Sequence, residues 1–179
     1  MLFRSVVIAG QGTCGLEIVE QLPDVALAIV PVSGGGLIAG IATVLHALRP
    51  GIRVVGVSMD GAAAMHASLA AGGPVQLDEV PSLADSLQGG IGLDNDTSFP
   101  IIRDLVEEIV LVTEDEIEAA MVHALREHRV ILEGAGAVGI AALSSGRVGA
   151  SSGPVAVVCS GANAEWDTVA ALVAQVDGG

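Results

Sequence analysis

The sequence predicts a three-layer α/β fold in which a mostly parallel sheet lies between helices on both faces. Short apolar runs, typical of strands buried on both faces, alternate with longer helical stretches along the chain. The connections between successive strands are too long for hairpins, so they are expected to cross over the sheet. The only aromatic residues are two Phe and one Trp, so small and β-branched side chains must fill the core.

Each element is predicted from a local pattern of apolar residues and of residues that end helices. An apolar run at residues 6–9 leads into the glycines of residues 10–15, and a helix is expected from Leu16 until Pro23. Strands are expected at residues 26–32, 52–57, 108–112 and 155–159. Further helices are expected at residues 37–48, 62–71, 114–128, 134–143 and 165–176.

Two helix starts carry a capping signal. Thr113 and Glu116 form the two ends of a capping box, in which each side chain accepts from the backbone N–H of the other. Ser98 is expected to cap a shorter helix, whose first turn tolerates Pro100. Before it, residues 72–98 are rich in Gly, Asp, Ser and Pro, and so long a loop is expected to be functional or to lie over neighbouring structure.

Charge and residue counts argue against several function classes. The net charge is −14 and the seven basic residues are arginines scattered singly, so no nucleic-acid partner is expected. No apolar run is long enough for a membrane span and no signal peptide is recognisable, which favours a soluble, cytoplasmic protein. Cys14 and Cys159 lie far apart without metal-ligand spacing, so reduced thiols and no metal site are expected.

The chain contains no lysine. This excludes a Walker A phosphate loop, which needs its Lys, and any Schiff-base nucleophile supplied by a side chain of this chain. The Gly10-x-Gly12-x-x-Gly15 pattern matches a dinucleotide fingerprint locally. However, the next strand runs into Val32 and Ser33 without the carboxylate that would hold a ribose, which argues against NAD. These glycines are expected instead to let a helix start tightly against the sheet.

Ser33-Gly-Gly-Gly36 is the strongest candidate for a ligand site. Consecutive glycines between a buried strand and a helix let several N–H groups converge, and the helix N-terminus adds a positive dipole. Such a cup binds phosphate without a cationic side chain. The alternative is a plain flexible turn.

A second loop, Cys159-Ser-Gly-Ala-Asn163, follows the last predicted strand and opens the last helix. Since parallel strands end at one edge of a sheet, it is expected to face the same crevice as the glycine cup. A hydroxyl in this loop suits a hydrogen bond to a ring nitrogen, and a Ser or Asn helix cap is the alternative.

Several other polar residues carry little functional signal alone. Glu133 precedes a helix of small residues, where acids are common because of the helix dipole. His46, His66, His123 and His128 share no motif and are interpreted as structural or surface residues. The spacing of His123 and His128 puts them on different faces of an α-helix.

Together these segments resemble the serine/threonine dehydratase and serine racemase family of pyridoxal-phosphate (PLP) enzymes, which have the tryptophan-synthase-β fold, or fold type II. The matching segments run in order from Ala9-Gly-Gln-Gly-Thr13 through Val30–Ala42, Ile91–Leu93, Ile109–Glu116 and Glu133–Ala137 to Ser160–Asn163. They cover nearly the whole chain but only the C-terminal half of the family's enzymes. Gly89–Asn95 is most similar to the dehydratases of hydroxyectoine utilisation.

The resemblance implies a site for pyridoxal 5′-phosphate. The family's phosphate loop corresponds to Ser33, Gly34, Gly35, Gly36 and Leu37. The partner of the pyridine nitrogen corresponds to Ser160, with Cys159 as the alternative, and Glu133 matches a glutamate close to the cofactor ring. An uncharged partner leaves the ring nitrogen largely unprotonated, which suits β-elimination.

The departures from the family are equally informative. The Schiff-base lysine, in a Ser-x-Lys-x-Arg motif, lies upstream of everything that matches here. The carboxylates that hold a divalent cation in the racemase branch fall near Ser58 and Ala64, so that metal site is expected to be absent. A cofactor-contacting glycine of the relatives corresponds to Ser86.

The expected organisation is a single partial domain over residues 1–179, the C-terminal part of the PLP-binding large domain without the domain that carries the catalytic lysine. The implied activity is that of a dehydratase (ammonia-lyase), which converts a small β-hydroxy amino acid such as threonine or serine to a 2-oxo acid. The chain alone would supply no catalytic residue. Three interpretations stay open: a partial dehydratase, one half of a split enzyme, and a non-catalytic module for another phosphate ligand. The expected partners are an amino-acid substrate and either a complementary N-terminal half or further copies of the chain.

Overall fold

The computed structural model describes residues 2–177, whose strands form one parallel sheet. The strands are β1 (Leu27–Pro31), β2 (Arg53–Met59), β3 (Glu108–Val112) and β4 (Val155–Val157). Their order is β3-β2-β1-β4, and every neighbouring pair is parallel. Leu27 of β1 lies beside Arg53 of β2 on one side and Val155 of β4 on the other, so β1 is an inner strand with a parallel neighbour on each side.

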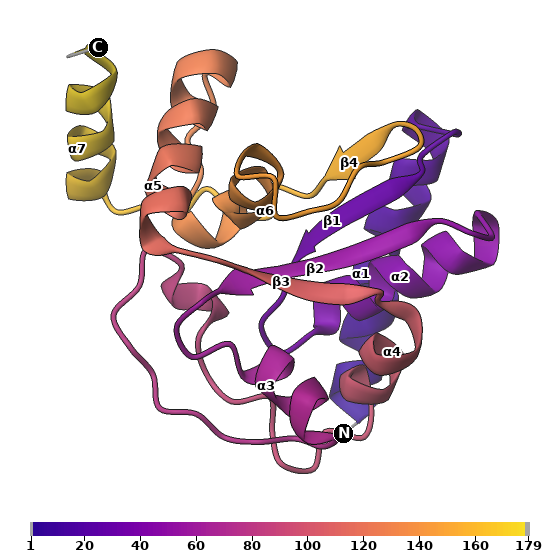
Figure 1. Ribbon diagram of the computed structural model, residues 1–179. Coiled ribbons are helices and arrows are strands. Elements are labelled where there is room, and N and C mark those ends of the chain that lie inside the picture. Colours follow the sequence, from indigo (N-terminus) through magenta and orange to yellow (C-terminus); the bar gives the residue numbers. More distant parts are fainter. Residues whose placement is uncertain (1, 178–179) are drawn as a thin grey trace.

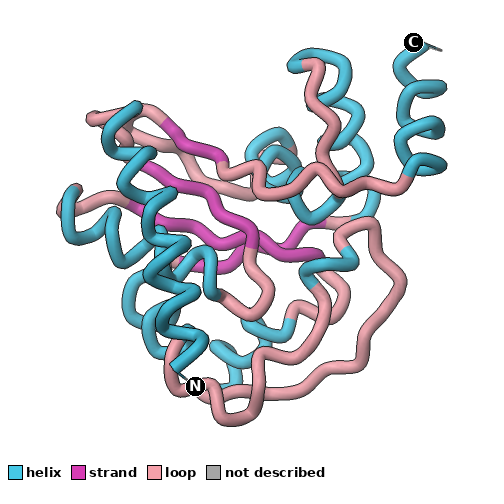
Figure 2. The backbone as a smooth tube through the Cα atoms, turned by 180° about the vertical axis from the view of Figure 1, so that it is seen from behind, coloured by secondary structure: helices cyan, strands magenta, loops and turns pink. Residues whose placement is uncertain are grey.

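Helices lie on both faces of the sheet, as Figure 1 shows from one side and Figure 2 from behind. The α-helices of the described chain are α1 (Leu2–Gln21), α2 (Gly36–Leu48), α3 (Ala64–Ala71), α4 (Ser98–Leu105), α5 (Glu114–His123), α6 (Gly134–Ser144) and α7 (Trp166–Asp177). Helix α7 stands beside α5, away from the sheet (Figure 1). Side chains alternate along β1: Ala28 and Val30 join the core under α1, α2 and α4, whereas Leu27 and Ile29 join the core under α5 and α6. The predicted three-layer α/β class is therefore confirmed. No helix of the described chain is long and apolar enough to cross a membrane.

The N-terminal segment differs from the sequence prediction. Residues 6–9 and the glycines at 10–15 are neither a strand nor a loop, because all of them belong to the single helix α1. The reason lies in α2, where a Cβ at Gly40 would come within 2.7 Å of the backbone nitrogen of Gly12. Gly12 and Gly15 face α2 in turn, beside Val44. The glycines thus let two helix backbones approach closely, and they do not start a helix against the sheet.

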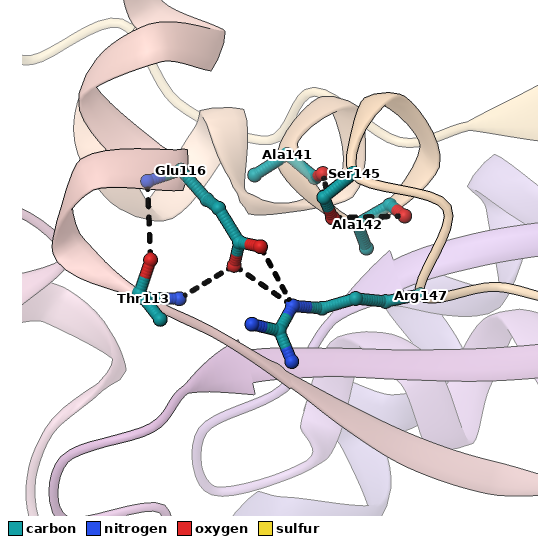
Figure 3. A network of polar contacts seen from close by, with 6 residues as sticks. All are labelled: Thr113, Glu116, Ala141, Ala142, Ser145 and Arg147. Atoms are coloured by element: carbon teal, nitrogen blue, oxygen red, sulfur yellow. Dashed lines mark hydrogen bonds and ion pairs between the residues drawn. The ribbon is translucent and has the colours of Figure 1, made fainter.

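The predicted capping box is confirmed and ties two helices together (Figure 3). The Thr113 hydroxyl accepts from the Glu116 N–H at 3.3 Å, and the Glu116 carboxylate accepts from the Thr113 N–H at 2.8 Å. The same carboxylate accepts from Arg147 Nε at 2.8 and 2.9 Å, which joins the start of α5 to the turn after α6. Burial alone would raise the pKa of Glu116, but the hydrogen bonds from Arg147 and Thr113 outweigh it and hold the pKa below its usual value.

Candidate functional site

The two predicted ligand loops leave the sheet at the same edge. β1 ends at Pro31 and leads into Ser33–Gly36, while β4 ends at Val157 and leads into residues 159–163. Because β1 and β4 are parallel neighbours, their carboxyl ends lie side by side. A pocket of about 250 Å³ opens between the loops, and its lining includes Ser33, Gly34, Gly35, Gly36, Leu37, Ser86, Glu133, Ala135 and Ser160.

The glycine loop has the backbone conformation that a cup for an anion requires. Gly35 has φ of 87°, in the left-handed region, and a side chain there would collide with Ile102 and come within 2.9 Å of the Met65 methyl group. Helix α2 begins at Gly36, so the N–H groups of its first turn have no carbonyl partner within the helix. A Cβ at Gly34 would meet no atom within 4 Å, so space lies open beside this peptide. Among the residues whose side chains the structure describes, none of those lining the pocket is an arginine, so the groups seen to suit an anion are the N–H groups and the helix dipole.

Glu133 and Gly136 hold the second loop in place, a role that the sequence did not indicate. The Glu133 N–H donates to the Gly161 carbonyl at 3.1 Å, and the Glu133 carboxylate accepts from the Asn163 N–H at 3.2 Å. A Cβ at Gly136 would lie 2.9 Å from the Gly161 nitrogen, so the loop lies directly on the first turn of α6. The N-terminus of α6 therefore fixes the residues that flank Ser160.

The long irregular segment before α4 lies along the edge where the strands end (Figures 1 and 2). Ser33 donates to the Gln88 carbonyl at 3.4 Å, and Ser86 lines the pocket. Asn95 takes the capping role that was predicted for Ser98: its Oδ1 accepts from the N–H of Ser98 at 3.0 Å. The predicted Ser98 cap is therefore wrong, because this hydroxyl donates to the Gly34 carbonyl at 2.7 Å. Gln88 and Ser98 therefore hold the later part of this segment against the glycine cup, which agrees with the predicted position over neighbouring structure.

The structure separates Cys159 from Ser160. Ser160 lines the pocket with the glycine loop, whereas Cys159 lines a neighbouring apolar pocket of about 450 Å³ beside β4. Partial burial raises the pKa of the Cys159 thiol, which keeps it protonated at neutral pH. The alternative in which Ser160 or Asn163 caps the last helix is wrong, because α7 begins only at Trp166.

The same apolar pocket corrects the prediction for two histidines. His123 and His128 both line it, and their ring centroids are 5.4 Å apart in an edge-to-face contact. They do not lie on different faces, because Ala124–His128 form a π-helical turn, which has more residues per turn than an α-helix. The wider turn brings positions five apart onto nearly the same side. Their interpretation as structural residues stays a prediction.

Comparisons with known proteins show the family of the chain. A family model described as "Pyridoxal-phosphate dependent enzyme" matches residues 2–161. The chain is 59% identical over 157 residues to a putative threonine dehydratase of Sinorhizobium fredii, and the matched region covers 88% of this chain and 47% of that protein. It is 46% identical over 168 residues to an L-threonine ammonia-lyase of Geobacter sulfurreducens, covering 94% of the chain and 41% of that protein.

Solved structures give the same result. Maize serine racemase superposes with a TM-score of 0.84 at 35% identity, over 94% of this chain and 52% of that one. The processed form of threonine deaminase isoform 2 from Solanum lycopersicum superposes with a TM-score of 0.81 at 36% identity, over 93% and 49%. The chain thus spans about half the length of the relatives that it matches. The roles of Ser33, the loop glycines, Glu133 and Ser160 toward a cofactor stay predictions.

Proposed function

We propose, since the chain belongs to the family of pyridoxal-phosphate-dependent enzymes, that it forms the C-terminal part of the cofactor-binding domain of an amino-acid dehydratase (ammonia-lyase). The substrate class is a small β-hydroxy amino acid such as threonine or serine, and the site of action is the cytoplasm. The observation that carries the proposal is the pocket in which the glycine loop of β1 and Ser160 after β4 meet.

The residues of the pocket fit pyridoxal 5′-phosphate. The N–H groups at Gly35, Gly36 and Leu37 suit the phosphate, because they meet at the N-terminus of α2 without a side chain in the way. Ser160 suits the pyridine nitrogen, since its uncharged hydroxyl can donate a hydrogen bond without fixing a positive charge on the ring. When bound, the cofactor supplies an aldehyde that links to the substrate amine and a ring that accepts electron density. Glu133 acts as a positioning residue that keeps the Ser160 loop against α6.

The missing lysine must come from elsewhere, and we propose a complementary N-terminal half as its source. The relatives are about twice as long as this chain, so they contain a second half that this chain does not match. Within the described residues the outer edge of β4 pairs with no strand. The apolar pocket beside this edge is lined by residues such as Leu132, Leu143 and Val157, and Leu143 remains 45% exposed. An unpaired strand edge next to exposed apolar surface is suited to adding a further strand.

Complementation tests this function. The N-terminal half of the Sinorhizobium fredii relative, which carries the part this chain does not match, is supplied as a separate polypeptide with pyridoxal phosphate. We expect neither polypeptide alone to release a 2-oxo acid from threonine or serine, and the mixture to do so. A mixture that forms a stable complex but releases no 2-oxo acid from either amino acid contradicts the proposed activity.

The absence of lysine supports a second candidate function. In that case the chain is a non-catalytic module that binds a phosphate compound through the glycine loop. A chain that binds several unrelated phosphate monoesters equally well, and that does not bind the complementary half, favours this candidate over the dehydratase.

A further inference from the structure

The glycine loop is held from behind by a buried serine. Ser98 is 3% exposed, and its hydroxyl donates to the Gly34 carbonyl at 2.7 Å. Ser98 Oγ also lies 3.1 Å from Asn95 Oδ1 and 2.9 Å from Asn95 Nδ2. A hydroxyl carries one hydrogen, and the Gly34 carbonyl can only accept. The short Gly34 contact therefore takes the Ser98 hydrogen, while Asn95 Nδ2 donates to the Ser98 oxygen.

Asn95 in turn is fixed on several sides. It is 4% exposed, and its Nδ2 also donates to the Ile91 carbonyl at 2.9 Å. Its Oδ1 accepts from the N–H of Ser98 at 3.0 Å and of Phe99 at 3.3 Å. A side chain with this many partners has one orientation, so the Ser98 hydroxyl has a defined direction as well.

The bond to Gly34 sets the direction of the next N–H. In a trans peptide the C=O of one residue and the N–H of the following residue point in opposite directions. The described chain has no cis peptide, so the Gly35 N–H points away from Ser98. Ser98, Met65 and Ile102 lie near the position of a Gly35 Cβ, and none of the three lines the pocket. The Gly35 N–H is therefore directed to the pocket side of the loop.

Without this bond the peptide has little to hold it. Glycines on both sides allow the Gly34–Gly35 peptide to rotate, because glycine accepts positive and negative φ almost equally. A rotated peptide would present the Gly34 carbonyl oxygen to the pocket in place of the Gly35 N–H. That change replaces a donor by an acceptor, which repels an anion.

We propose that Ser98, held by Asn95, is a positioning residue that aims the Gly35 N–H into the pocket and so creates its selectivity for a phosphate group. This inference rests on the proposed function, because it takes the glycine loop to be the phosphate site. It assigns a role in the site to Ser98, the first residue of α4, and to Asn95 before this helix, although neither lines the pocket.

The test uses two probes that differ only in the phosphate: pyridoxine 5′-phosphate and pyridoxine, neither of which has an aldehyde. Binding to the 179-residue chain is followed through backbone amide shifts in NMR titrations. We expect Ser98→Ala to weaken binding of pyridoxine 5′-phosphate about 10- to 100-fold, the effect of losing one hydrogen bond to a charged group, and to leave pyridoxine within about twofold. Ser98→Thr keeps the hydroxyl and should restore most of the affinity.

Ser68→Ala is the matched control. Ser68 is fully buried and its hydroxyl donates to the Ala64 carbonyl at 2.6 Å, but it belongs to α3 and does not line the pocket. Should Ser98→Ala fail to fold, Ser98→Cys has a similar volume with only a weak donor and takes its place. If the Ser68 variant loses phosphate affinity as much as the Ser98 variant, the effect is general loosening and the positioning role is wrong.

A second readout separates this inference from the proposed function. The residual dipolar coupling of the Gly35 N–H reports its direction in the ligand-free chain, and we expect it to change in Ser98→Ala but not in Ser68→Ala. If the native chain binds both probes equally, the phosphate site is wrong, and the Gly35 coupling still decides whether Ser98 sets the peptide. An unchanged coupling in the Ser98 variant overturns the inference, whatever the native chain binds.

Discussion

Replacing Gly136 by Ala would place a methyl group against the backbone of the Ser160 loop. An ideal Cβ at Gly136 lies 2.9 Å from the Gly161 nitrogen and closer still to the Gly161 oxygen. Neither atom is the end of a flexible side chain, so α6 and the loop must move apart. Overpacking of this kind costs about 1–3 kcal/mol.

Gly10→Ala is the matched control for the intrinsic preference of the helix. Gly10 lies in the interior of α1, and a Cβ there meets nothing within 4 Å. Gly10→Ala gains the helix propensity of Ala over Gly, about 1 kcal/mol in a helix interior, whereas Gly136→Ala, in the first turn of α6, gains at most that amount. A difference between the two variants larger than about 1 kcal/mol therefore reports the clash, and we expect Gly136→Ala to be less stable than Gly10→Ala by about 1–3 kcal/mol.

Urea unfolding monitored by circular dichroism measures this difference, provided that both variants keep the same dependence on urea concentration. The Ser160 and Gly161 amide shifts should change in Gly136→Ala and remain native in Gly10→Ala. A Gly136→Ala chain that is as stable as Gly10→Ala, with native Ser160 and Gly161 shifts, would refute the close contact between α6 and the loop.

Three further outcomes follow from the structure and the sequence. Arg147 and Thr113 hold the pKa of Glu116 below its unfolded value, so this carboxylate stabilises the fold above the unfolded pKa, and the stabilisation is lost as pH falls through the folded pKa. Arg147→Met should lower the free energy of unfolding by about 0.5–1 kcal/mol at neutral pH, and in urea unfolding at a series of pH values it should weaken the loss of stability toward acid pH. Gly35→Asp should abolish binding of pyridoxine 5′-phosphate in calorimetry while Ser160→Ala weakens it far less, and a folded Gly35→Asp chain with native affinity would make the loop a simple turn. Pyridoxal phosphate mixed with the chain alone should keep the absorbance of the free aldehyde and give no 2-oxo acid from serine or threonine, whereas measurable turnover by pure protein would contradict the need for a lysine from elsewhere.

Helix α1 shows where local patterns were misleading. Ile8, Gly12 and Gly15 are buried and lie three to four residues apart, so the sequence did contain the spacing of one buried helix face. The glycines concealed it, because glycine is also the residue of loops and phosphate turns. The deciding partner, Gly40 of α2, lies far along the chain, and no local signal joins it to Gly12.

The sequence by itself determined the elements whose cause is local. The fully apolar strands, the capping box of Thr113 and Glu116, and the glycine loop before α2 each depend on residues a few positions apart, whose spacing fixes backbone hydrogen bonds and allowed φ values. It also determined that no side chain of this chain can supply a Schiff-base lysine.

Only the tertiary structure decided which groups support the site. Ser98 is 64 residues from the carbonyl that it binds, and Glu133 is 30 residues from the N–H that its carboxylate accepts. Sequence patterns describe neighbours along one helix or strand, and such distant pairs exist only after the crossover helices have packed on the sheet. That Ser160 lines the pocket of the glycine loop while Cys159 lines another pocket has the same origin, because only the packed sheet determines which residue of this pair lies on the side of the glycine loop.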